Sequence, residues 1–196
     1  ARLQPKANSK SGKVKLIMRT TKLHSPNPKG YSLGHSLAHI FYPHNFPKII
    51  ASGTHGNSTQ SKFRVTYSKK INLTEESQKG IEGFYKKNLE CNDGVAHYEA
   101  HQKKLGDSAF CLADKIYQES GVFPNPRAMN AGKSKKNKIV YFEINFVYLP
   151  RAISFVEKMP KNTPAQKLRK KQATVLLEEL KKIKNSFGFA KIHPQN

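Results

Sequence analysis

Apolar residues recur at helical spacing in several separate stretches of the chain. The clearest stretch runs from Ala109 to Ser120, where most apolar side chains fall on one face and Gly121 follows as a helix-ending residue. The same periodicity predicts further helices over residues 31–41, from 74 to about 89, over 96–105 and from 164 to about 186. Thr74, which precedes two acidic residues, is a suitable N-cap for one of them.

The last predicted helix is amphipathic. Its large apolar side chains recur at intervals close to three and four residues and are expected to share one face: Leu168, Val175, Leu176, Leu180, Ile183 and Phe187. Lysine and arginine residues surround this face. The pattern therefore predicts a helix with one apolar side and a strongly basic remainder.

Four short runs rich in β-branched, aromatic and other apolar residues predict strands, over residues 14–18, 48–52, 63–67 and 139–142. The second and third runs flank a segment rich in glycine, serine and threonine, which predicts a hairpin. By contrast, the proline- and asparagine-containing segment 121–130 predicts an irregular loop. Strands dominate the first part of the chain and helices the second, so the sequence predicts an α+β fold.

This distribution also predicts how the chain is divided. We expect a flexible basic arm over residues 1–12 and a strand-rich lobe with a small antiparallel sheet over 13–73. A mainly helical lobe would follow over 74–188, with a hairpin and loop over 121–146, and the chain would end in a tail over 189–196.

Three polar residues stand at fixed intervals around the strand 139–142. Asn125 and Asn130 are five residues apart, and Glu143 comes thirteen residues after Asn130, at the end of the strand. This order of helix, loop, strand and acid resembles the core of the protein-kinase-like fold, in which H-R-D-L-x-x-x-N precedes a metal-binding D-F-G. Phe123-Pro124-Asn125 stands where the family has H-R-D, and Glu143 stands where it has the Asp of D-F-G.

The resemblance implies a reduced protein-kinase-like architecture with ATP and Mg²⁺ as cofactors. Asn130 and Glu143 would hold Mg²⁺, and Asn125 would occupy the position of the catalytic base. Leu16-Ile17-Met18-Arg19 resembles the V-A-I-K signature, so Arg19, or alternatively Lys15, would meet the phosphates.

The chain departs from the kinase pattern at several of its functional positions. An asparagine such as Asn125 cannot accept a proton as an aspartate does, and no G-x-G-x-x-G precedes the first strand. The helix 31–41 carries His35 and His39 but lacks the glutamate that pairs with the strand lysine in the family. The resemblance therefore implies a weak or inactive phosphotransferase.

The charge of the chain supports an alternative from a different class. Thirty-five Lys and Arg residues against thirteen Asp and Glu residues give a net charge of +22, which attracts nucleic acids and other polyanions. Lysine predominates over arginine, and lysine suits phosphate contact better than base recognition. The cluster Lys133–Lys138 is expected to form a hairpin tip, either merely solvated or binding an anion. A nucleic-acid-binding protein that contacts the RNA or DNA backbone is thus the second hypothesis.

Histidines offer a third alternative. His97 and His101 are four residues apart, the spacing of two zinc ligands on one helix face, although the order H-E-x-x-H of the metalloproteases is absent. With His35 they are also candidate acid–base groups of a basic toxin or nuclease. A pair of surface histidines remains the simpler interpretation.

The number of cysteines and the hydropathy of the chain indicate the cellular compartment in which the protein is expected. Two cysteines, Cys91 and Cys111, do not make a disulfide framework, and no run of eighteen apolar residues is present. We expect a cytoplasmic protein without a transmembrane segment. Because the sequence begins with Ala1 rather than methionine, secretion after removal of a signal peptide stays open.

Overall fold

The computed structural model describes residues 16–22, 28–55, 63–87 and 92–183 of the chain. The predicted arm 1–12, Lys15, Cys91 and the tail 189–196 lie outside these ranges. The described part combines helices with small antiparallel sheets, so the α+β prediction is confirmed. Within these ranges no helix is long and apolar enough to cross a membrane.

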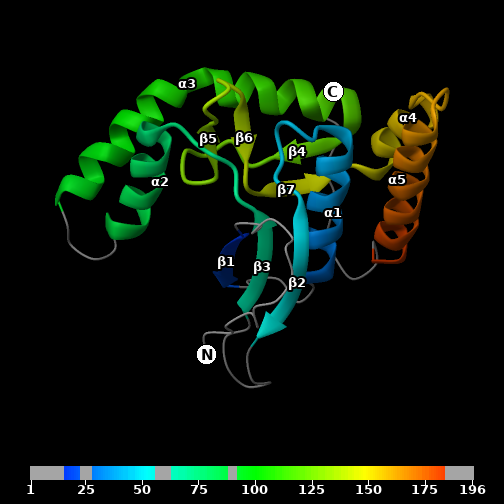
Figure 1. Ribbon diagram of the computed structural model, residues 1–196, viewed down its shortest axis with the longest axis horizontal. Helices are drawn as coiled ribbons and strands as arrows, with labels where there is room; N and C mark the ends of the chain where they lie inside the picture. Colours follow the sequence, from blue (N-terminus) through cyan, green and yellow to red (C-terminus); the bar gives the residue numbers. More distant parts are fainter. Residues whose placement is uncertain (1–15, 23–27, 56–62, 88–91, 184–196) are drawn as a thin grey trace, which may run out of the picture.

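The first part of the chain forms a three-stranded antiparallel sheet in the order β1-β3-β2. Its elements are β1 (Leu16–Lys22), α1 (Pro28–Phe41), β2 (Ile49–His55) and β3 (Phe63–Lys69). The predicted pairing of the second and third strands is confirmed, and β1 adds to the outer side of β3. Helix α1 lies beside β2, so the connection between β1 and β2 carries a helix (Figure 1).

Helices α2 (Glu75–Lys87) and α3 (Asn92–Ser120) form an antiparallel pair (Figure 1). The hydroxyl Oγ1 of Thr74 accepts the main-chain N–H of Ser77 at 3.3 Å, which confirms the predicted N-cap. The sequence predicted two separate helices where α3 runs. Gly106 lies between these two segments with a non-helical backbone (φ 46°, ψ −148°), so the predicted break is confirmed as a kink in α3.

Four short strands follow in two antiparallel pairs, β4 with β7 and β5 with β6. They are β4 (Val122–Pro124), β5 (Ala131–Lys133), β6 (Ile139–Tyr141) and β7 (Ile144–Val147). The predicted hairpin with a lysine-rich tip is confirmed as β5–β6. The prediction of a wholly irregular loop over 121–130 was wrong, because β4 pairs with a distant strand, β7, that the sequence pattern did not predict.

Two helices complete the described chain, α4 (Leu149–Lys158) and α5 (Pro164–Ile183). Helix α4 was not predicted. Pro150 lies in the first turn of α4. Main-chain N–H groups in the first turn have no acceptor within the helix, so the N–H that proline lacks costs no helical hydrogen bond. Ala152 and Val156 of α4 are buried.

The buried face of α5 differs from the predicted apolar face. Ala173, Leu177, Leu180 and Ile183 are buried, so the prediction holds for Leu180 and Ile183. Leu168 and Val175 are 57% and 56% exposed, and the prediction was wrong for them. The prediction considered only large apolar side chains and therefore omitted Ala173, a small residue on the buried face of α5.

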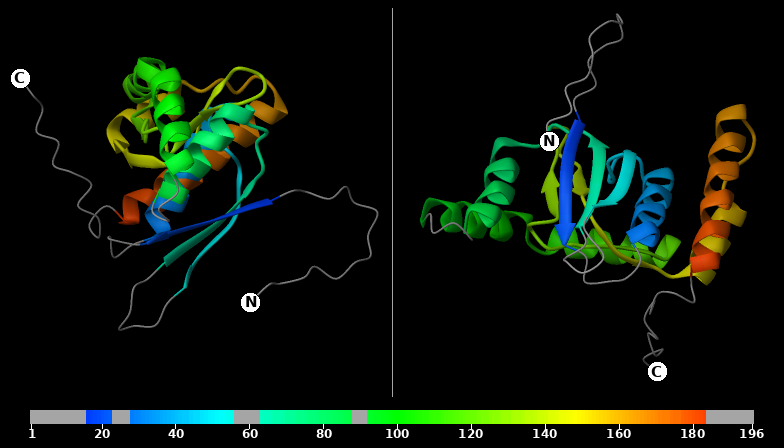
Figure 2. Two further views of the ribbon diagram at one scale, coloured as in Figure 1. Left: turned by 90° about the vertical axis from the view of Figure 1, so that its left-hand side faces the viewer. Right: turned by 90° about the horizontal axis from the view of Figure 1, so that it is seen from below.

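The hydrophobic core lies among α1, α3, α4, α5 and the two short strand pairs. Figures 1 and 2 show α3 on one side of these strand pairs and the three-stranded sheet on the other. Tyr141 on β6 is fully buried, and its hydroxyl donates a hydrogen bond to the carbonyl oxygen of Ala109 on α3 at 2.6 Å. This contact fixes the β5–β6 hairpin to the long helix.

Candidate functional site

Two main-chain hydrogen bonds join the loop 125–130 to the end of strand β6. The N–H of Asn125 donates to the carbonyl oxygen of Glu143 at 3.0 Å, and the N–H of Phe142 donates to the carbonyl oxygen of Asn130 at 2.8 Å. Both ends of the loop therefore lie against the segment that carries Glu143. The structure brings together the three residues that the sequence singled out.

The loop itself consists of tight turns. The side-chain oxygen Oδ1 of Asn125 lies 3.3 Å from the main-chain nitrogen of Arg127 and accepts its N–H. The N–H of Asn130 donates to the carbonyl oxygen of Arg127 at 2.7 Å. Asparagine suits the first position because its short side chain replaces a main-chain acceptor in such turns. Asn125 thus shapes the loop in addition to its place in the candidate site.

The three side chains differ in their access to solvent. Asn130 is 2% exposed, whereas Asn125 and Glu143 are half-buried. A ligand arriving from solvent would reach Glu143 and Asn125 more readily than Asn130. Glu143 supplies the only carboxylate among the three.

His101 positions the loop from the other side. Its Nε2 atom lies 3.1 Å from the carbonyl oxygen of Ala128 and 3.0 Å from that of Ala131. Carbonyl oxygens only accept, so Nε2 carries a hydrogen shared between them. His101 is 2% exposed, and it lies against Gly80 of α2, where an added Cβ would come within 2.2 Å of it.

This arrangement corrects the simpler interpretation of His97 and His101 as a pair of surface histidines. His101 is buried and faces two carbonyl groups, while His97 is exposed on α3. Among the described residues no group of three His, Cys, Asp or Glu side chains could hold a metal ion. No sequence pattern indicated the role of His101, because the carbonyl groups that it contacts lie about thirty residues further along the chain.

The histidines of α1 hold the chain that leads into β2. The ring nitrogen Nε2 of His35 lies 3.1 Å from the carbonyl oxygen of Pro47, and Nδ1 of His39 lies 2.7 Å from that of Phe46. His35 is 6% exposed. These two side chains fix the position of the segment before β2.

One of the two candidate phosphate-binding residues belongs to the first strand. Arg19 lies on β1, opposite Thr66 of β3 in the antiparallel register. Lys15 precedes β1 and lies outside the described residues. Their relation to Glu143 therefore remains a prediction.

A scan against protein-family models and searches of curated proteins and of solved structures found no match for this chain.

Proposed function

We propose that this chain is a divergent protein-kinase-like domain that binds ATP with Mg²⁺ and acts as a weak or inactive phosphotransferase. The observation that carries the proposal is the pair of hydrogen bonds from Asn125 to Glu143 and from Phe142 to Asn130. They bring the residues at the base position and at both metal-ligand positions of the family pattern to one place.

The order of elements supports the same proposal. The resemblance implies a strand, a helix and two further strands before the helical part, and β1, α1, β2 and β3 follow in that order. It also implies a helix, a loop, a strand and an acid, and α3, the loop 125–130, β6 and Glu143 follow in that order. Fold alone does not establish an activity, so the argument rests on the residues of the loop.

The donor atoms at this place fit Mg²⁺. Magnesium prefers oxygen ligands and is commonly held by one or two protein groups together with water and substrate phosphates. The carboxylate of Glu143 and the amide oxygen of Asn130 are such groups. When bound, Mg²⁺ would neutralise charge on the phosphates of ATP. The half-buried Glu143 would be the principal protein ligand because Asn130 is nearly inaccessible.

Phosphate contact would come from the first strand. Arg19 or Lys15 takes this role in the proposal, because one of them stands at the lysine position of the V-A-I-K pattern. The family's partner glutamate is replaced on α1 by histidines that bind main-chain carbonyl groups instead. A strand cation without this partner would be held less firmly, which lowers the expected affinity for nucleotide.

The chemistry expected at Asn125 is limited. Its amide cannot take a proton from an attacking hydroxyl, and its oxygen already accepts the N–H of Arg127. Phosphoryl transfer depends mainly on positioning and charge, so a slow reaction remains compatible with this residue. We therefore expect nucleotide binding to be easier to detect than turnover.

Thermal unfolding with ATP, with and without Mg²⁺, tests the proposal. At one hundred times its dissociation constant a ligand stabilises the folded state by about 2.7 kcal/mol. We expect stabilisation by ATP that requires Mg²⁺, that is lost in Glu143→Gln and that is weakened in Asn130→Ala. Each variant is compared with and without ligand, so a lower starting stability of Asn130→Ala does not affect the result.

Glu157→Gln is the matched control, because Glu157 is exposed on α4 and its replacement removes the same charge. It should retain the full stabilisation by ATP and Mg²⁺. An equal shift without Mg²⁺, or an equal shift in Glu143→Gln, would contradict the proposed site.

A further inference from the structure

A pocket of about 450 Å³ lies where the β5–β6 turn, the segment before β2 and the segment after β3 meet. We call it the lysine pocket, because its lining includes five exposed lysines: Lys48, Lys70, Lys135, Lys136 and Lys138. Among the described residues that line it, none carries a carboxylate. The five lysine ammonium groups therefore line one pocket whose described lining contains no Asp or Glu to neutralise their charge.

The main chain holds three of these lysines on an ordered turn. The N–H of Ser134 donates to the carbonyl oxygen of Lys138 at 2.8 Å, and Asn137 takes the left-handed conformation (φ 56°) that the tight turn requires. The N–H of Lys135 donates to the carbonyl oxygen of Asn72 at 2.9 Å, which joins the turn to the segment after β3. The lysines of the two segments are thus kept side by side by backbone contacts.

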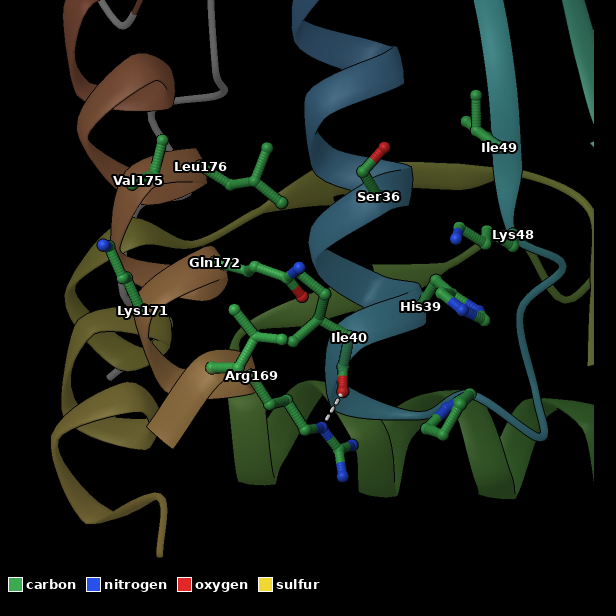
Figure 3. Close-up of a pocket in the computed structure, with 12 residues that line it drawn as sticks. Ser36, His39, Ile40, Lys48, Ile49, Arg169, Lys171, Gln172, Val175 and Leu176 are labelled. Atoms are coloured by element: carbon green, nitrogen blue, oxygen red, sulfur yellow. Dashed lines mark hydrogen bonds between the residues drawn. The ribbon is translucent and has the colours of Figure 1, made fainter. Parts of the chain in front are cut away.

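The lysine pocket continues into a second hollow. His39, Pro43 and Lys48 line both, and the second hollow, of about 700 Å³, runs between α1 and α5 to Lys171. Figure 3 shows Lys48 beside β2 and Lys171 on α5, with α1 between them. Lys48, Arg169 and Lys171 line this second hollow among aliphatic side chains, so positive charge continues from the β5–β6 turn towards α5.

We propose that the lysine pocket binds the sugar–phosphate backbone of a nucleic acid, without reading its bases. Lysine provides point charges suited to phosphate contact. Among its described lining residues the one Phe, Tyr or Trp side chain, Phe46, is 0% exposed, which leaves only histidine rings for stacking on unpaired bases. The continuous path to α5 favours a polymer over a small polyphosphate. The +22 charge of the chain adds a long-range attraction.

This site is separate from the proposed nucleotide site. Asn130 precedes β5 and Phe142 follows β6, so the nucleotide site adjoins the open end of this hairpin. The lysine pocket adjoins the turn at its other end, and three residues of strand separate the ends by roughly 10 Å. The two proposals can therefore fail independently.

Fluorescence anisotropy with labelled 20-base-pair RNA and DNA duplexes over a salt series tests the inference on the full chain. The test variant is Lys48→Gln/Lys70→Gln/Lys136→Gln. The control Lys103→Gln/Lys158→Gln/Lys161→Gln removes the same charge from exposed lysines that line neither hollow. Substitutions at exposed sites usually change stability by no more than about 0.5 kcal/mol, which thermal unfolding verifies for both variants.

We expect the test variant to lose at least about tenfold in affinity near 0.1 M salt. The slope of log K against log salt concentration should become shallower by about two to three, since each neutralised phosphate contributes about 0.9. The control should lose much less, and RNA and DNA duplexes should bind alike. Glu143→Gln should leave duplex binding unchanged.

Three results would overturn the inference. The first is absence of duplex binding by the wild-type chain. The second is equal loss in the test and control variants, which would assign binding to the overall charge. The third is displacement of the duplex by inorganic polyphosphate at a far lower phosphate concentration than by unlabelled duplex, which would assign the pocket to a compact polyanion.

Discussion

The main-chain nitrogen of Asn125 lies 3.0 Å from the carbonyl oxygen of Glu143, to which its N–H donates, across eighteen residues of sequence. The segment between them contains the loop 125–130 and the whole β5–β6 hairpin. Closing this segment at its base places Glu143 beside the start of the loop. The hydrogen bond is therefore the structural basis of the proposed nucleotide site.

Restoring the acids of the kinase pattern should increase turnover. In Asn125→Asp/Glu143→Asp a carboxylate that can accept a proton stands at the base position, and general bases typically contribute 10²- to 10⁴-fold. We expect ATP hydrolysis, measured by release of labelled γ-phosphate, to rise at least about tenfold. Asn162→Asp/Glu157→Asp, which makes the same changes at exposed sites, is the control. Unchanged hydrolysis in a double variant that still binds ATP and Mg²⁺ would argue against the assigned base position.

His101 should contribute strongly to stability, and His97 should not. His101→Ala removes a buried ring and leaves the carbonyl groups of Ala128 and Ala131 without their donor. We expect a loss of about 2–4 kcal/mol in the free energy of unfolding, measured by urea denaturation. The exposed His97→Ala should change it by less than about 0.5 kcal/mol. Similar losses in the two variants would contradict the positioning role of His101.

Gly121 should tolerate no side chain. It adopts φ 71°, and a Cβ there would lie 2.4 Å from the carbonyl oxygen of Tyr148. Gly121→Ala combines backbone strain with a steric clash, so we expect a loss of about 2 kcal/mol or more in thermal unfolding. Gly53 on β2, whose added Cβ would meet nothing within 4 Å, supplies the control substitution to Ala. If Gly121→Ala left the free energy of unfolding unchanged, α3 would not end with the left-handed backbone conformation described at Gly121.

Alkaline pH should weaken the fold through Tyr141. Burial raises the pKa of its phenol above the ordinary value of 10.0. The unfolded chain then releases this proton at a lower pH than the folded chain does. The stability contributed by protonated Tyr141 is complete below a pH of about 10 and is lost as the pH rises above it. Tyr141→Phe should show a shallower decline of unfolding free energy between pH 9.5 and pH 11, and an unchanged slope would contradict this cause.

The long helices could be predicted from sequence because apolar residues recur at a spacing close to 3.6 residues, although the buried face of α5 was predicted only in part. The strands β4 and β7 could not, since three- and four-residue strands carry too little pattern and depend on pairing with a distant segment. Helix α4 was not predicted, although Pro150 lies in its first turn, where proline suits a helix.

The candidate site was predictable in part. The intervals between Asn125, Asn130 and Glu143 indicated a shared location, and the backbone hydrogen bonds place them together. The function of His101 was not predictable, because its partners depend on how α3 lies across the loop. Likewise, the lysines of the β5–β6 turn meet Lys48 and Lys70 only through the tertiary fold.

The most direct test of the central claim replaces Mg²⁺ by paramagnetic Mn²⁺ in the presence of ATP and records amide signals by NMR. We expect the strongest broadening at Asn130, Phe142 and Glu143, little at Lys136 in the hairpin turn, and loss of the effect in Glu143→Gln. Absence of broadening at these amides, or broadening centred on the acids of α5, would contradict a metal–nucleotide site at Glu143.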